Sequence, residues 1–211
     1  MSLDIIIPPE IYHDSVYSIL INTIRSDPTI RTVVEIGASS GAGSTEALLK
    51  GLDGRTNAML YSIEVSYGRF ALLQKRSSHV CLHGSTCSID EFPSDEEVLS
   101  TCAKFGIGTS LDWKTNDILY LQRHPELDTN ILARVSSAID FVLIDGSEFL
   151  GFRELQKVYG ARYIALDDKN VYKNIQAHQQ LLNDENYTCI FDVSIRNGFS
   201  IFKKKDALCI I

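Results

Sequence analysis

The stretch VVEIGASSGAGS, residues 33–44, decides the fold of this 211-residue chain. Its first four residues extend a β-branched run that begins at Thr32, and such runs favour buried strands. The three glycines that follow let the chain bend sharply and let a ligand approach the backbone closely. Ser44 or its neighbour Thr45 can cap a helix over residues 46–50. This order of strand, glycine-rich turn and helix predicts a ligand site at the carboxyl end of the first strand of an open α/β sheet.

Strands and helices continue to alternate along the rest of the chain. The expected strands cover residues 59–64, 80–82, 139–144, 162–166, 187–194 and 199–203, and the expected helices cover 10–25, 66–76, 152–159 and 171–182. Asn197-Gly198, between the last two strands, is a strong signal for a hairpin turn. The pattern predicts a Rossmann-like, doubly wound and mostly parallel seven-stranded sheet, with helices on both faces and a C-terminal antiparallel hairpin.

We expect a single domain over residues 1–211, with residues 1–28 as an N-terminal helical cap. The interval 83–138 is too long for an ordinary crossover connection between parallel strands, and it holds three helical-looking pieces. These pieces cover residues 94–104, 116–123 and 129–136. We expect a helical insertion over the mouth of the active site that forms part of the substrate site. Its aromatic residues can stack on a sugar or an aromatic ring, although each also suits an ordinary core. They are Phe105, Trp113 and Tyr120.

Composition narrows the possible partners and location. Acidic residues outnumber basic ones, 27 to 20, for a formal net charge of -7, which argues against nucleic acid as a partner. No stretch approaches the roughly 18 apolar residues that a membrane span needs, and the first residues do not resemble a signal peptide. The five cysteines, an odd number that includes Cys209, show no CxxC spacing, so neither a disulfide framework nor a zinc site is indicated. A cytoplasmic location without membrane partners is expected, and oligomeric state is not readable.

The spacing of the glycines and two acids indicates the type of cofactor. A dinucleotide-binding turn has the order G-x-G-x-x-G, whereas this turn reads G-x-x-x-G-x-G and follows Glu35. An acid at that position suits a cofactor with a cationic amino-acid end better than a pyrophosphate. Glu64 closes the second expected strand, 21 positions after Gly43. A carboxylate at that place typically binds the two hydroxyls of a ribose.

Three further acids follow two late strands. Asp145 ends one strand and Asp167-Asp168 end the next, so their carboxylates meet if the two strands are neighbours. Carboxylates that meet repel one another, and a cation or hydrogen-bond donors must compensate them. Hard Mg²⁺ or Ca²⁺ prefers such oxygen ligands, and the carbonyl of Asn170 can add another. The alternative is that Asp145 contacts cofactor or substrate while Asp168 caps the following helix.

These motifs together resemble those of a known enzyme family. VVEIGASSGAGS looks like the first motif of class I S-adenosylmethionine-dependent methyltransferases, and LYSIE, residues 60–64, looks like the second. FVLIDGSE and ARYIALDD resemble the late-strand motifs of its small-molecule O-methyltransferase branch, which includes catechol-type enzymes. The resemblance covers roughly residues 30–203 and is poor between residues 80 and 138. It implies S-adenosylmethionine as cofactor and O-methylation of a small molecule or a carbohydrate, and it allows a divalent cation to assist.

The resemblance also assigns residues by position. The implied cofactor-binding residues are Glu35, Gly37, Ala38, Ser39, Gly41, Gly43, Ser44, Glu64, Gly84, Ser85 and Asp145. The implied metal ligands are Asp145, Asp167 and Asp168.

The chain departs from the family pattern at the expected catalytic base. Related sequences carry a histidine, and catechol-type enzymes a lysine, at the position of Glu148. Asp145 and Glu148 are therefore our candidate catalytic residues, and His83 is a further candidate base. The alternatives are a non-catalytic module that binds the same cofactor and, with less support, an NAD-dependent oxidoreductase. Nothing favours an aminopropyl-type transferase.

Overall fold

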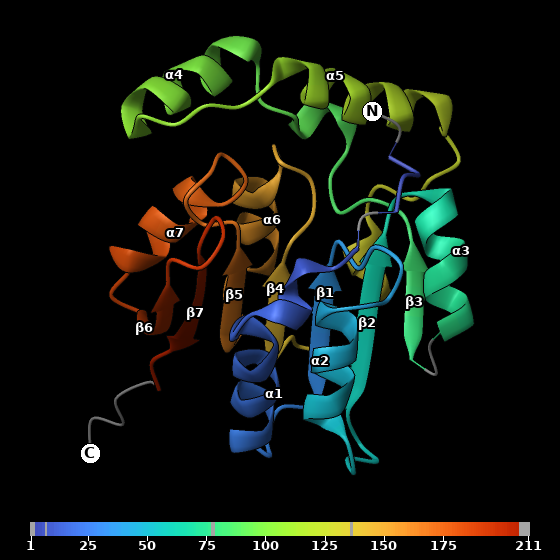
Figure 1. Cartoon of the computed structure of the whole chain (residues 1–211), viewed down its shortest axis with the longest axis vertical. Coiled ribbons are helices and arrows are strands. Elements are labelled where there is room, and N and C mark those ends of the chain that lie inside the picture. The colour runs from blue at the N-terminus through green and yellow to red at the C-terminus, as the bar shows by residue number, and fades with distance from the viewer. Residues whose placement is uncertain (1–2, 7, 77–78, 136, 207–211) are drawn as a thin grey trace.

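The computed structural model describes residues 3–6, 8–76, 79–135 and 137–206, and within them seven strands form one sheet in the order β3-β2-β1-β4-β5-β7-β6. The strands are β1 (Thr32–Ile36), β2 (Met59–Glu64), β3 (Val80–His83), β4 (Phe141–Ile144), β5 (Tyr163–Asp167), β6 (Tyr187–Val193) and β7 (Phe199–Lys204). All of them point the same way except β7, which is antiparallel to both of its neighbours. The predicted mostly parallel sheet with a C-terminal hairpin is confirmed (Figure 1).

Helices cover both faces of the sheet, as predicted. On one face lie α1 (Val16–Ser26) and α2 (Ser44–Leu52), and on the other lie α6 (Gly151–Val158) and α7 (Ile175–Leu182). Successive residues of a strand therefore enter different cores: Val33 packs on the α1–α2 side and Val34 on the α6–α7 side, both without exposed surface. Burial on both faces explains why the central strands are continuous apolar runs rather than alternating ones. The helix α3 (Tyr67–Arg76) packs on β2 and β3.

The long interval before β4 holds the short 3₁₀ turn η2 (Ile89–Glu91), the helices α4 (Asp95–Phe105) and α5 (Leu111–Arg123), and a second 3₁₀ turn, η3 (Ile131–Arg134). Figure 1 shows α4 and α5 lying across the end of the sheet toward which the parallel strands point. Local sequence sets the limits of α4, because Ser94 and Glu97 form a capping box at its start and Gly106, at φ +66°, ends it.

Two expected helices differ from the structure. The helix expected over residues 10–25 is interrupted: η1 (Glu10–His13) precedes α1, and the Asp14 carboxylate accepts the backbone N–H of Val16 between them. The helix expected from residue 171 begins only at Ile175, because residues 171–174 form a turn. Asn174 in that turn donates its side-chain amide to the carbonyls of Ile144 and Asp167, which ties the turn to the ends of β4 and β5.

Two broader expectations concern disulfides and membrane spans. Among the described residues no disulfide is present, and none of their helices has both the length and the apolar character to cross a membrane. Parts of the predicted cap and insertion, and Cys209, fall at residues 1–2, 7, 136 and 209, which lie outside the described part of the chain.

Candidate functional site

A cavity of about 440 Å³ opens at the carboxyl ends of β1, β2, β4 and β5. The sequence-predicted residues that line it are Gly37, Ala38, Ser39, Ser44, Glu64, Gly84, Ser85, Asp145, Asp167 and Asp168. Because the sheet order reverses between β1 and β4, this is the switch point where open α/β sheets bind ligands. The insertion contributes Phe92, Asp117 and Leu121 to the wall.

The turn after β1 lies directly against the loop after β4. Gly37 adopts φ +91°, and a Cβ atom there would stand 2.2 Å from the carbonyl oxygen of Asp145, so only glycine fits. The N–H groups of Gly37 and Ala38 both donate to the carbonyl of Ile63. Gly41 and Gly43 are not among the lining residues, since they pack against Leu73 and against Pro9 and Ile11 respectively. These two glycines therefore contribute to the conformation of the turn and do not line the cavity.

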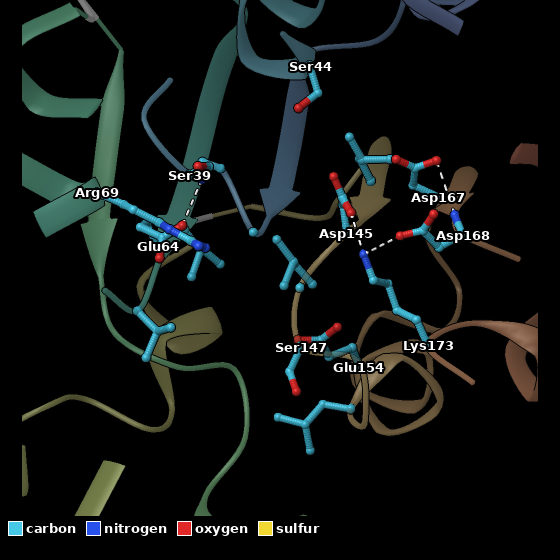
Figure 2. Close-up of a pocket in the computed structure, with 18 of the residues that line it drawn as sticks. Ser39, Ser44, Glu64, Arg69, Asp145, Ser147, Glu154, Asp167, Asp168 and Lys173 are labelled. Atoms are coloured by element: carbon cyan, nitrogen blue, oxygen red, sulfur yellow. Dashed lines mark hydrogen bonds and ion pairs between the residues drawn. The ribbon is translucent and has the colours of Figure 1, made fainter. Parts of the chain in front are cut away.

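Glu64 lies at one end of the cavity, where backbone groups hold it. Its Oε2 accepts the N–H of Ser39 at 2.7 Å (Figure 2). Its Oε1 accepts the N–H of Ser66 at 2.8 Å. Only 4% of the residue is exposed, and this burial raises the pKa of its carboxyl above the ordinary value. A carboxylate has about four lone-pair positions, so Glu64 retains acceptor capacity for hydroxyl groups in the cavity.

Glu35 is fully buried and does not line the cavity. Its Oε2 accepts the hydroxyls of Thr45 and Ser62, while its Oε1 has no partner. Burial raises the pKa of its carboxyl. Contact between Glu35 and a cofactor stays a prediction, and what the structure displays is a link between β1, β2 and the start of α2.

Asp145, Asp167 and Asp168 converge at the other end of the cavity, and carboxylate oxygens of the three lie within 4.8 Å of one another. They meet because β4 and β5 are neighbours, as the sequence analysis assumed. Figure 2 shows Lys173 between two of them, with its Nζ 2.8 Å from Asp145 Oδ1 and 2.7 Å from Asp168 Oδ2. The sequence predicted that a cation or hydrogen-bond donors must compensate these carboxylates. In this structure the side chain of Lys173 supplies that positive charge.

Arg196 compensates the third carboxylate. Its guanidinium donates to both oxygens of Asp167, at 3.2 and 3.3 Å, and to Asp14 at 2.7 Å. Burial, with Asp145 and Asp168 nearby, raises the pKa of Asp167 to about 7. For Asp168 burial acts in the same direction, but the Lys173 ammonium outweighs it and lowers the pKa below the usual value. Conversely, burial opposes the charge of Lys173, and the two carboxylates overcome it and raise its pKa.

The two other candidate bases do not line the cavity. Glu148 lies in the loop after β4, where the Thr109 hydroxyl is 3.4 Å from its Oε1, and burial raises its pKa to about 6. His83 stacks on Phe70, and its Nε2 is 3.1 Å from the carbonyl of Val65.

Sequence reasoning missed Lys173, Arg196 and Glu154. Glu154 is 2% exposed, lines the cavity and accepts the Thr86 hydroxyl at 2.6 Å through Oε1, while its Oε2 has no partner. Burial raises its pKa to about 7. A sequence signal for Glu154 did exist. Glu154 belongs to the set of residues that helical periodicity places on the core-facing side of α6, together with Gly151, Leu155 and Val158.

Comparison with solved structures identifies the fold. A methyltransferase from Podospora anserina, solved with S-adenosylhomocysteine, aligns over 90% of this chain and 78% of its own, with a TM-score of 0.54 and 14% identity. A methyltransferase from Geobacter sulfurreducens aligns over 95% and 81%, with a TM-score of 0.55 and 10% identity. The fold is that of the class I S-adenosylmethionine-dependent methyltransferases.

A third structure with this methyltransferase fold is named a "putative caffeoyl-CoA O-methyltransferase" from Staphylococcus aureus. It aligns over 91% of this chain and 84% of its own, with a TM-score of 0.55 and 11% identity. No protein-family model matches the chain, and neither does any curated protein. At such low identity the likeness concerns the fold alone.

Proposed function

We propose that this protein is an S-adenosylmethionine-dependent methyltransferase that methylates an oxygen of a small molecule. The observation that carries the proposal is Glu64: a buried carboxylate at the end of β2 that lines a switch-point cavity beside a glycine-rich turn. A nucleoside with a ribose diol suits such a carboxylate. The neighbours with the same fold, one of them solved with S-adenosylhomocysteine, support the choice of nucleoside.

The residues present fit this cofactor. Glu64 would hold the ribose hydroxyls, and Gly84 and Ser85, which follow β3, would lie beside the adenine. Glu154 has an unpartnered buried oxygen in the same cavity, which suits an amino group of the ligand. The turn from Gly37 to Ser39 brings backbone atoms to the cavity without side-chain bulk. When bound, the cofactor supplies a methyl group on a positively charged sulfur.

The acceptor would enter beneath the insertion, whose Phe92, Asp117 and Leu121 line the cavity. The acidic balance of the chain disfavours nucleic acid, so a small molecule or a carbohydrate remains our proposal, in the cytoplasm. Methyl transfer depends chiefly on positioning and exclusion of water, and a hydroxyl acceptor must also lose its proton. Asp145 lines the cavity and Glu148 lies three residues further on, and these two carboxylates stay the proposed catalytic residues.

Divalent-metal assistance was part of the expectation, and the donor set can be tested against it. Three carboxylates are ligands that Mg²⁺ prefers. In this structure, however, the ammonium of Lys173 bonds Asp145 and Asp168, and Arg196 bonds Asp167. A metal ion does not fit among these oxygens while Lys173 holds its position.

The test is calorimetric titration with S-adenosylmethionine, S-adenosylhomocysteine and NAD. We expect micromolar binding of both sulfur compounds, at least about tenfold weaker binding in Glu64→Ala because a charged hydrogen bond is lost, and no NAD binding. Glu185→Ala, an exposed acid, is the matched control and should bind as the wild type does. Binding of NAD alone would overturn the proposal. Binding of the sulfur compounds without turnover on a panel of phenols, acids and sugars would favour the non-catalytic module.

A further inference from the structure

Lys173 stands where a divalent cation would have to bind. Its Nζ lies within 2.8 Å of Asp145 and 2.7 Å of Asp168, and its side chain lines the cavity while being only 11% exposed. The three carboxylates around it would otherwise form an oxygen cage at metal-ligand spacing. We propose that Lys173 is a built-in cation that replaces the metal ion at this site, so that the protein binds no divalent cation there.

The backbone fixes Lys173 in this position. The turn at residues 171–174 is held by Asn174, whose amide donates to Ile144 at the end of β4 and to Asp167 at the end of β5. Gly151 packs so closely on the turn that a Cβ atom there would stand 2.2 Å from the Lys173 carbonyl oxygen. A lysine on an unanchored loop would extend its ammonium into water, whereas this one is directed at the strand ends.

The charge arrangement also disfavours a further cation. Arg196 already pairs with Asp167 and Asp14, so the carboxylate oxygens of this cluster face two positive side chains, Lys173 and Arg196. Asp168 adopts the left-handed conformation at φ +55°, which is uncommon outside glycine. A divalent ion would have to displace the Lys173 ammonium, because like charges at contact distance repel strongly in a poorly solvated site.

The ammonium has a role toward the acceptor, and this part rests on the proposed function. It carries three N–H donors, of which Asp145 and Asp168 take two, which leaves one for an oxygen in the cavity. A single positive charge polarises a hydroxyl less than a divalent ion does. The acceptor class that fits is therefore an oxygen that ionises readily, a phenol or a carboxylic acid, rather than an aliphatic hydroxyl.

In that reaction the acceptor first loses its proton to one of the proposed catalytic carboxylates, which passes it to solvent, and the Lys173 N–H orients the resulting oxyanion. A lone pair of this oxygen forms the new bond to the methyl carbon. The bond between that carbon and sulfur breaks, its electron pair stays on sulfur, and the sulfur becomes neutral.

The test is Mn²⁺ binding, measured by calorimetry and by the loss of the free-ion electron paramagnetic resonance signal. It compares the wild type with Lys173→Met and with Lys169→Met. Lys169 is a matched control because it is equally buried, lies four positions earlier and pairs with Asp192 outside the cavity. We expect no saturable Mn²⁺ binding by the wild type or by Lys169→Met. Lys173→Met frees the carboxylates of Asp145 and Asp168, and we expect it to bind one Mn²⁺ saturably, at least about tenfold more tightly than the weakest affinity that the titration detects. Adding Asp168→Asn to that variant should abolish it.

Each outcome decides the inference. Stoichiometric Mn²⁺ binding by the wild type overturns it. So does a Lys173→Met variant that unfolds cooperatively in urea, and is therefore folded, yet gains no Mn²⁺ site. If that variant is unfolded, Lys173→Gln serves in its place under the same criteria. Failure of the wild type to bind S-adenosylhomocysteine contradicts the proposed function alone, because the metal measurement needs no cofactor. Turnover of phenols that persists in excess chelator supports the acceptor class, and turnover restricted to aliphatic hydroxyls contradicts it.

Discussion

The two ends of the cavity hold their carboxylates in different ways. Glu64 is held by two backbone N–H groups, whereas Asp145, Asp167 and Asp168 are held by the side chains of Lys173 and Arg196. Arg69, which also lines the cavity, acts on Glu64 through its charge and partly offsets the effect of burial on the Glu64 pKa. The groups that bond the Glu64 carboxylate are backbone N–H groups, and they leave it acceptor capacity for a neutral diol. At the Asp145 end, Lys173 and Arg196 bond the three carboxylates directly, and Lys173 offers an N–H donor. The cavity therefore offers a hydrogen-bond acceptor at one end and a donor at the other, which suits a ligand with hydroxyls at one end and an acceptor oxygen at the other.

The largest expected effect comes from Gly37, where the two ends meet. Gly37→Ala places a Cβ atom 2.2 Å from the Asp145 carbonyl at φ +91°, and we expect a loss of about 4 kcal/mol in the free energy of unfolding. Gly54→Ala is the control, since Gly54 has φ +79° and no atom within 4 Å of its Cβ position. Its cost should be about 1 kcal/mol, from backbone strain alone. Equal costs in urea titrations would show that the close approach is unimportant.

Arg196 gives the next largest effect, because it joins the acidic end to the N-terminal segment. Arg196→Met leaves Asp167 and Asp14 without their cation, and we expect a loss of about 3 kcal/mol in stability. The control, Arg134→Met, removes an ion pair with Asp128 in which the arginine is 60% exposed. Such surface pairs contribute about 0.5 kcal/mol. If the two variants unfold at the same urea concentration, Arg196 does not hold the acidic end together.

An effect of similar size, about 3 kcal/mol between low and high pH, is expected from Glu154. Its pKa rises from the ordinary 4.5 to about 7 because it is buried. Between these values the folded carboxyl keeps a proton that the unfolded one has lost, so the free energy of unfolding falls as pH rises from about 4.5 to 7 and then levels. Glu154→Gln should remove this fall and be the more stable protein at pH 8, with little difference at pH 4.5.

Thr86→Val sharpens the same measurement. The Thr86 hydroxyl bonds Glu154 and lowers its pKa, against the larger effect of burial. Its loss should extend the fall in stability to higher pH. Parallel stability curves for wild type and Glu154→Gln across this range would exclude Glu154 as the origin of the pH dependence.

The same comparison explains what the sequence could predict. The strand β1 and the turn after it are set by local residues, so their prediction needed no tertiary knowledge. Glu64 could be placed because a residue that ends the second strand always reaches the same edge of the sheet. The convergence of Asp145 and Asp167 followed from one assumption, that β4 and β5 pair, and this assumption is confirmed.

The partners of those acids could not be predicted from spacing. Lys173 reaches Asp145 only because Asn174 anchors a turn where helical periodicity predicted a helix. Arg196 reaches Asp167 from the β6–β7 connection, which the hairpin signal placed in sequence but not in space. Likewise Glu35 is buried away from the cavity because α2 packs over β1, and the sequence does not specify this packing. Side-chain partners drawn from distant segments are a property of the tertiary structure.

The smallest effect tests whether Glu64 is truly held by the backbone. Ser66→Ala removes the hydroxyl that donates to Asp4 at 2.7 Å and accepts the N–H of Arg69 at 3.2 Å, but it leaves the Ser66 N–H that donates to Glu64. We expect a loss of about 2 kcal/mol in stability, as for two hydrogen bonds. Affinity for S-adenosylhomocysteine should stay unchanged, because the atoms that position the carboxylate are all retained. A large loss of affinity in calorimetry, with stability as expected, would mean that the Ser66 hydroxyl helps to orient Glu64 and that the two ends of the cavity are less different than the structure indicates.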